Sequence, residues 1–345
     1  TSSETSLYDY ILPFDIAQCA ELLQERHEVY RIGRIGSYGD ETDMRDRALG
    51  LLSVRGERPS RRAADKEGLL VWADRIDAAL LDAAPRLRAV CNMMVGYNNF
   101  DVPAMTAAGV MATNTPDVLT DTTADFGFAL LMATARRITE SEHWVRAGHW
   151  DKWSIVNNPL GMDLHHSTVG IIGMGRIGQG IAKRALGFGM NVIYHNRSHL
   201  SDADEKACGA KYVSKEELLR TADHVVLVLP YSAESHHTIG AKEIALMKST
   251  ATLINIARGG IVDDAALAQA LRDKKIFAAG LDVFEGEPSV HPELLKLSNV
   301  VLAPHIASAT EKTRRAMVDL AVENLRAALN GEKPPSLINP ELLKS

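Results

Sequence analysis

The sequence predicts an α/β fold with two doubly wound parallel-sheet domains. Short apolar runs alternate with longer segments of helical periodicity along the chain, which is typical of βαβ units. The chain has 345 residues, enough for two domains of ordinary size. A glycine motif begins only at Gly173, so a complete domain fits before it.

The first part of the chain is expected to form one parallel sheet. Five short apolar segments predict its strands, with helices between them: Tyr10 to Leu12, Val29 to Ile32, Leu51 to Val54, Leu87 to Met93 and Val110 to Thr113. A long helix, roughly Thr122 to Gly148, is expected after the turn at Pro116. Its apolar run Phe126 to Met132 suits a connector buried between two domains.

The second part predicts a complete doubly wound sheet. Its expected strands are Thr168 to Gly173, Asn191 to Tyr194, His224 to Leu229, Thr252 to Ile256, Ala278 to Val283 and Asn299 to Leu302. The segment Glu311 to Leu329 predicts an amphipathic helix that returns to the first domain. The predicted domains are therefore a discontinuous one, residues 1–115 and 306–345, and a second one, residues 116–305.

Composition argues against several classes of protein. A net charge of −6 does not suit general nucleic-acid binding, and no apolar run is long enough to span a membrane. The segment TSSETSLYDY lacks the features of a secretory signal, so a cytoplasmic location is expected. The cysteines Cys19, Cys91 and Cys208 form no CxxC pair and are expected to be structural thiols. No metal site is expected.

The segment STVGIIGMGRIGQGIAKRA predicts a dinucleotide site. Gly173, Gly175 and Gly178 follow a β-branched strand and open a helix. The first glycine permits a tight turn, the second lets the backbone approach a pyrophosphate, and the third allows close helix packing. A strand-to-helix turn without a ligand is the alternative interpretation, but the flanking strands and helix favour a cofactor.

The end of the next strand, VIYHNRS, predicts which cofactor is preferred. Dinucleotide folds that prefer NAD generally carry an acidic residue there, and this chain has Asn196, followed by Arg197 and Ser198. A guanidinium and a hydroxyl can hold a 2′-phosphate through charge-assisted hydrogen bonds. NADP(H) is therefore the expected cofactor, with NAD(H) possible. Arg197 as a solvated surface charge is the alternative.

Three ionisable residues follow predicted strands: Arg258 in INIARGG, Glu287 in DVFEGEP and His305 in LAPHIASAT. The carboxyl ends of strands open onto the ligand crevice of a doubly wound sheet, so the three side chains are expected to converge. Reduction of a keto acid needs a cation for the carboxylate, an acid for the carbonyl oxygen, and a partner that keeps the acid protonated. Each of the three taken alone also suits a structural role.

INIARGGIVDDAAL, AAGLDVFEGEP and VVLAPHIASAT resemble signature segments of the D-isomer-specific 2-hydroxyacid dehydrogenases. VGYNNFDVPA, NTPDVLTDTTAD and RAGHWDKW are similar to the branch of glyoxylate/hydroxypyruvate and 2-ketogluconate reductases. The resemblance covers nearly the whole chain from Val90 onward. It implies a Rossmann dinucleotide-binding domain and a discontinuous flavodoxin-like substrate domain.

The resemblance also implies catalytic roles. His305 is the general acid in reduction, Glu287 is its carboxylate partner, and Arg258 binds the substrate carboxylate. Backbone amides near Val95 and Gly96 contact the same carboxylate.

The resemblance further implies contacts with the cofactor and with a second subunit. Asp282 binds the nicotinamide carboxamide, and Trp153 reaches the substrate pocket of the partner in a homodimer. The remaining cofactor-binding residues are expected to be Met174, Arg176, Ile177, Pro230 and Ala257.

Some alternatives stay open. Glyoxylate, hydroxypyruvate and 2-ketogluconate all suit the predicted site, and Arg55 is either a second anion contact or a surface charge. Ala307 stands where many relatives have glycine, which leaves the size of the pocket open. The alternative from another class is a dinucleotide-sensing corepressor-like binding protein on the same scaffold.

Overall fold

The structure is a computed structural model that describes residues 50–51, 67–72, 74–155 and 157–343. The chain divides into two compact units, Thr1–Leu119 with Thr310–Ser345, and Thr120–Ala309. The predicted domain boundaries after residues 115 and 305 lie a few residues from these divisions and stay a prediction. The strands expected at Tyr10 to Leu12 and Val29 to Ile32 lie outside the described residues.

The second unit contains one parallel sheet in the order β11-β10-β9-β8-β5-β6-β7. Its strands are β5 (Thr168–Ile172), β6 (Asn191–His195), β7 (Ala210–Tyr212), β8 (His224–Leu227), β9 (Thr252–Asn255), β10 (Ala278–Leu281) and β11 (Val300–Leu302). Strand order reverses between β5 and β8, which is the switch point of a Rossmann sheet. The six predicted strands are confirmed, and β7 is an additional edge strand.

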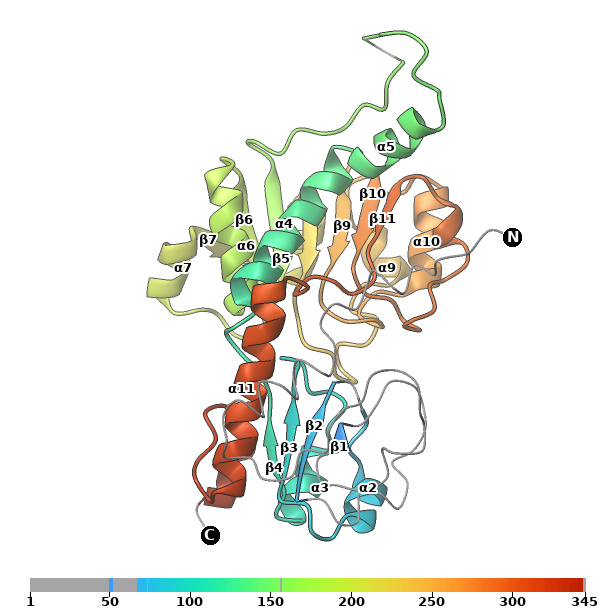
Figure 1. The fold of residues 1–345 in the computed structure, drawn as a ribbon. Coiled ribbons are helices and arrows are strands. Elements are labelled where there is room, and N and C mark those ends of the chain that lie inside the picture. Colours follow the sequence, from blue (N-terminus) through green and yellow to red (C-terminus); the bar gives the residue numbers. More distant parts are fainter. Residues whose placement is uncertain (1–49, 52–66, 73, 156, 344–345) are drawn as a thin grey trace, which may run out of the picture. The chain divides into compact units, whose positions relative to one another are not determined.

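Alternating side chains along these strands enter two separate cores. On β8, Val226 packs in one core, whereas Val225 and Leu227 pack in the other. Helices therefore cover both faces of the sheet (Figure 1), as buried parallel sheets require. They are α4 (Thr120–Ala135), α6 (Arg176–Gly187) and α7 (Asp202–Cys208) on one face, and α8 (Lys215–Thr221), α9 (Ala241–Ile244) and α10 (Asp264–Arg272) on the other. A 3₁₀ helix, η3 (Leu294–Lys296), precedes β11.

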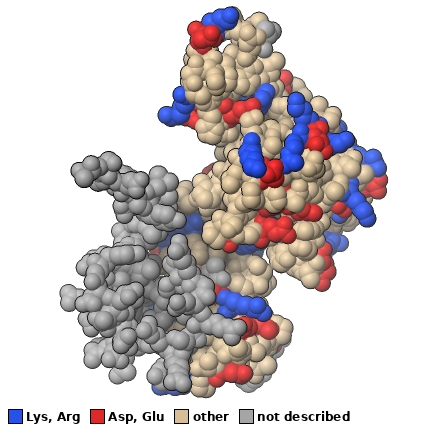
Figure 2. All heavy atoms as spheres, turned by 90° about the vertical axis from the view of Figure 1, so that its right-hand side faces the viewer, with Lys and Arg blue, Asp and Glu red and all other residues tan. Residues whose placement is uncertain are grey.

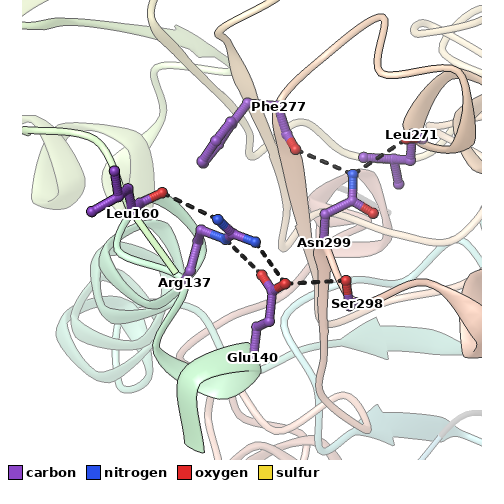
Figure 3. A network of polar contacts seen from close by, with 7 residues as sticks. All are labelled: Arg137, Glu140, Leu160, Leu271, Phe277, Ser298 and Asn299. Carbon is purple, nitrogen blue, oxygen red and sulfur yellow. Dashed lines mark hydrogen bonds and ion pairs between the residues drawn. The ribbon is translucent and has the colours of Figure 1, made fainter. Parts of the chain in front are cut away.

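The prediction of one helix from Thr122 to Gly148 was wrong, because α4 ends at Ala135 and α5 (Ile138–Arg146) follows it. Arg137 interrupts the helix with a left-handed φ of 52°. Figure 3 shows its guanidinium on the Glu140 carboxylate, with both N···O distances 2.6 Å, while Ser298 donates to the same carboxylate. Helix α4 packs on α6, β9 and β10 of its own unit.

The described sheet of the first unit has the parallel order β1-β2-β3-β4. Its elements are β1 (Gly50–Leu51), β2 (Gly68–Val71), α2 (Ala78–Ala83), β3 (Ala89–Asn92), α3 (Val102–Ala107), β4 (Met111–Thr113), α11 (Glu311–Leu329) and the 3₁₀ helix η4 (Pro340–Leu343). The expected strand at Leu51 to Val54 is described only at Leu51. The sequence interpretation missed β2.

Helix α11 has the predicted bounds and packs on β2 and β3. Val318, Ala321 and Leu325 lie in one core with Leu70 and Cys91. This contact joins the C-terminal segment to the first sheet, as the amphipathic pattern indicated.

At the N-termini of six described helices, a side chain accepts the backbone N–H of the residue three positions later, which satisfies one free donor of that helix. These caps are Asp77, Asp101, Ser201, Ser214, Asp263 and Thr310.

Lys and Arg side chains are interspersed with Asp and Glu over the described part of the face in Figure 2. No helix among the described residues is long and apolar enough to cross a bilayer. Cys91 and Cys208 are free buried thiols, and burial raises the pKa of Cys91 to about 12, although a hydrogen bond with Thr113 opposes the shift. Cys19 lies outside the described residues.

Asn339 joins the C-terminal segment to β4 through hydrogen bonds. Its side chain is fully buried, accepts the N–H of Ala112 at 2.9 Å and donates to the carbonyl of Val110 at 2.9 Å. Asn339→Ala should lower the free energy of unfolding by about 2–4 kcal/mol, because each buried backbone group left unpaired costs about 1–3 kcal/mol. Urea unfolding measures this. The exposed Asn330 is the control, and an Asn330→Ala change of similar size would contradict the assignment.

Candidate active site

The turn after β5 has the shape that a pyrophosphate requires. Gly173 has a left-handed φ of 104°, and a Cβ there would lie 2.7 Å from backbone atoms of Val228. A Cβ on Gly175 would meet nothing within 4 Å, and one on Gly178 would lie 2.4 Å from the carbonyl oxygen of Gly173. The second glycine thus leaves open space at the N-terminus of α6, and the third lets the helix pack on the turn.

Asn196, at the end of β6, supports this turn. Its Oδ1 accepts the N–H of Met174 at 2.7 Å, while Arg197 and Ser198 are exposed beside it. The positive charge of Arg197 contributes to a lowered pKa of Glu234, whose first cause is a hydrogen bond with Ser232. The cation therefore lies within electrostatic reach of an acidic side chain on the loop after β8.

Arg258 follows β9 and is half-buried. The buried Asn255 holds this turn, because its Oδ1 accepts the N–H of Ala257 at 3.0 Å and its Nδ2 donates to the carbonyl of Arg258 at 3.3 Å. A Cβ on Gly259 would lie 1.7 Å from the carbonyl oxygen of Phe284. Only glycine therefore allows the Arg258 turn to approach the segment after β10.

Glu287 belongs to that segment. Its Oε1 accepts the N–H of Phe284 at 3.0 Å, and the N–H of Glu285 donates to the buried Asp264 at 3.0 Å. The other oxygen of Glu287, Oε2, lies 2.8 Å from Nδ1 of His305. The remaining ring nitrogen, Nε2, has no hydrogen-bond partner among the described residues.

His305 follows β11 in a left-handed conformation, with φ 55°, that few residues other than glycine adopt. Asp282 holds it there. The carbonyl of Asp282 accepts the N–H of His305 at 2.9 Å, and its carboxylate accepts the N–H groups of Ile306 at 2.8 Å and Ala307 at 2.9 Å. Because His305 and the two residues after it are bonded to one buried side chain and its backbone, the imidazole is fixed against Glu287.

Charges link the three ionisable residues. Burial acts against ionisation of Glu287, but the hydrogen bond and charge of His305, the N–H of Phe284 and the charge of Arg258 keep its pKa below its usual value. Burial lowers the pKa of Arg258, an effect that Glu287 opposes, and a guanidinium stays protonated regardless. The group is thus a cation and an anion beside an imidazole.

Asp282 differs from these groups. Burial raises its pKa to about 6, and the charge of Glu287 adds to the shift, whereas the N–H groups of Ile306 and Ala307 and the charge of His305 oppose it. Both oxygens are engaged with backbone, so its structural role is positioning the segment of His305. Its expected contact with a nicotinamide carboxamide stays a prediction.

Val95 and Gly96 belong to the first unit. The carbonyl of Val95 accepts from Asn114 and that of Gly96 from Asn92, both at 2.7 Å. Neither backbone amide donates to any described residue. These fixed turn amides remain candidates for binding an anion.

The other expected site residues are spread over the second unit. Met174 and Ala257 are buried, Ile177 is half-buried, and Arg176, Pro230 and Trp153 are exposed. Arg55 lies outside the described residues. The sequence interpretation missed the positioning roles of Asp282 and Asn255, although a polar residue at the end of a buried strand was a signal for each.

Comparison with known proteins identifies the chemistry. The D-isomer specific 2-hydroxyacid dehydrogenase NAD binding domain matches residues 128–307. The glyoxylate reductase of Thermococcus kodakarensis is 50% identical over 288 residues, which cover 82% of this chain and 86% of that protein. The glyoxylate reductase of Thermococcus onnurineus is 52% identical over 274 residues, covering 79% and 82%.

Solved structures agree. An NADPH-dependent glyoxylate/hydroxypyruvate reductase from Sinorhizobium meliloti, in complex with NADP and malonate, has a TM-score of 0.75 and 37% identity, covering 83% of this chain and 89% of that one. The TT0316 protein from Thermus thermophilus has a TM-score of 0.79 and 38% identity, covering 93% and 96%. The chain is thus an oxidoreductase that uses a nicotinamide dinucleotide and reduces 2-keto acids, and it belongs to the D-isomer specific 2-hydroxyacid dehydrogenase family.

Proposed function

We propose that this enzyme uses NADPH to reduce a small 2-keto acid to the D-2-hydroxy acid, with glyoxylate, hydroxypyruvate and 2-ketogluconate as candidate substrates. The observation that carries the proposal is the His305–Glu287 pair, at 2.8 Å, with the charge of Arg258 acting on Glu287. The three residues follow β9, β10 and β11, which are neighbours in the sheet. A bound nicotinamide cofactor supplies the hydride.

His305 is the proposed general acid. Its Nδ1–H donates to Glu287, so Nε2 holds the proton that passes to the carbonyl oxygen as the alcohol forms. Glu287 stabilises the imidazolium, because a carboxylate within hydrogen-bonding distance favours the charged ring. In oxidation the neutral ring accepts the same proton.

Arg258 is the proposed carboxylate binder. Its planar fork matches a carboxylate with two hydrogen bonds, and it stays charged at any assay pH. The amides of Val95 and Gly96 are proposed to bind the substrate carboxylate as well, since no described residue accepts from them.

The cofactor preference rests on the end of β6. Arg197 and Ser198 are exposed beside the glycine turn, and no carboxylate stands where NAD-preferring folds generally have one. Arg197 forms no ion pair with another described residue, so its guanidinium is open to a 2′-phosphate. The NADPH dependence of the similar reductase from Sinorhizobium meliloti supports this preference.

We also propose a cytoplasmic homodimer. Large apolar side chains are exposed along and after α5: Ile138, Val145, Trp150, Trp153, Ile155 and Leu160. Trp153, at 76% exposure, is the proposed contact with the partner's substrate pocket. A corepressor-like binding protein is the alternative function, and turnover distinguishes the two.

Steady-state turnover of the three keto acids with NADPH tests the proposal. Arg258→Lys keeps the charge but loses the fork, so kcat/KM should fall by about 10²-fold, as after removal of one oxyanion-hole donor. Arg272→Lys is the matched control, because Arg272 lies on α10 and pairs with Glu293. Absence of turnover on all three substrates, or an unchanged Arg258→Lys enzyme, would contradict the assignment.

The two reaction directions should depend on pH with opposite signs. Reduction takes a proton from the enzyme and should weaken as pH rises, whereas oxidation returns a proton to it and should strengthen. Glu287 and Asp282 face the imidazole, and Arg258 acts through Glu287. Glu287→Gln removes an anion that favours imidazolium, so it should move the alkaline limb of reduction to lower pH. Profiles of kcat/KM check both statements, and equal trends in the two directions would refute the assignment of His305.

Cofactor selectivity should depend on Arg197. Arg197→Asp should lower the ratio of kcat/KM with NADPH to that with NADH by at least about tenfold, because a hydrogen bond to a charged group contributes about 1.5–3 kcal/mol. Lys211→Asp, on β7, is the control for a general charge effect. A wild-type enzyme that prefers NADH tenfold would overturn the proposal.

A further inference from the structure

A cluster of potential metal ligands lies at the carboxyl edge of the second sheet. His236 and His237 stand on the loop after β8, and Glu285 follows β10. One ligand atom from each of the three lies within 4.8 Å of the others. None of the three belongs to the proposed catalytic group, so the cluster needs its own explanation.

The ligand atoms lie close together, and because the two imidazole rings are stacked, one ring has to turn before both nitrogens point to the same ion. Nε2 of His237 lies 2.8 Å from Oε1 of Glu285, and the rings of His236 and His237 are stacked with centroids 3.8 Å apart. Nδ1 of His236 lies 3.2 Å from the hydroxyl of Tyr231, which leaves its Nε2 for another ligand. Two imidazole nitrogens and a carboxylate oxygen are thus brought together.

The backbone holds these side chains in place. His237 has a left-handed φ of 49°, and its N–H donates to the carbonyl of Gly260 at 2.7 Å. The N–H of Glu285 donates to Asp264 at 3.0 Å. Asp263 lies 4.0 Å from Nδ1 of His237, opposite the nitrogen that faces Glu285. At this distance Asp263 adds a negative charge behind the ring without hydrogen-bonding it.

The donor set suits a borderline metal ion. Nitrogen and carboxylate oxygen ligands of this kind bind Zn²⁺ and its first-row neighbours, whereas Mg²⁺ and Ca²⁺ prefer oxygen alone. The side chains of His237 and Glu285 are 35% and 39% exposed, so an ion can enter from solvent and retain water. We infer that His236, His237 and Glu285 form a binding site for a zinc-like divalent cation. The competing explanation is an ion pair that stabilises the two loops and binds no metal.

Metal titration of the full, tag-free chain after chelator treatment tests this inference. Calorimetry with ZnCl₂ should show one saturable equivalent per chain, and Co²⁺ should develop visible absorption bands on binding. His237→Asn and Glu285→Gln should each lower the Zn²⁺ affinity by at least about tenfold, because even outer-shell changes cost 10–100-fold. Asparagine tolerates the left-handed backbone of residue 237.

The pair His165 and His166 offers a matched control. These two residues are also adjacent and exposed, and the second also has a left-handed φ, of 63°. They belong to no three-ligand group among the described residues. The double variant H165A/H166N, with asparagine again at the left-handed position, should bind Zn²⁺ as the wild type does. The inference fails if the wild type takes up no Zn²⁺, or if Glu285→Gln, with an unchanged circular dichroism spectrum, binds it equally tightly.

Discussion

The site depends on one buried carboxylate. Asp282 accepts the N–H groups of Ile306 and Ala307, and its carbonyl accepts that of His305. These bonds compensate for a backbone conformation at His305 that is unfavourable on its own. Without them, the imidazole would lose the direction that places Nδ1 on Glu287. The raised pKa of Asp282 reflects the free energy that burial of this charge costs.

Close backbone packing joins the other two strand ends. Gly259 leaves no room for a side chain against the carbonyl of Phe284, and Phe284 in turn donates its N–H to Glu287. The turn of Arg258 and the turn of Glu287 are therefore in contact through backbone. Asn255 and Asp264 complete the arrangement by holding one turn each.

Much of the fold could be predicted, because its strands are buried runs bounded by helices. β2 (GLLV) was missed although it is a buried apolar run as long as β8 and β9, whereas β7 (AKY) is a partly exposed edge strand that contains no apolar run. The break at Arg137 was missed for another reason. No glycine or proline marks it, and contacts with Glu140 and Leu160 accompany it in the folded chain.

The proposed catalytic residues could be predicted because strand ends and motif order point to them, and their roles stay a prediction. The residues that position them could not be predicted, since the hydrogen bonds of Asp282 and Asn255 depend on the directions of their side chains. The cluster of His237 and Glu285 joins residues 48 positions apart, and no local spacing indicates it.

His305, Glu287 and Arg258 all belong to the same compact unit, Thr120–Ala309. The sheet of this unit carries all three, and the contact between His305 and Glu287 lies within it. In the proposed reaction, groups fixed in this way need little dipolar rearrangement when charge develops on the carbonyl oxygen, and such preorganisation is the main source of rate enhancement. Substitutions in loops away from these strand ends can consequently change which substrate is preferred. The reorganisation energy of the proposed proton transfer then stays low.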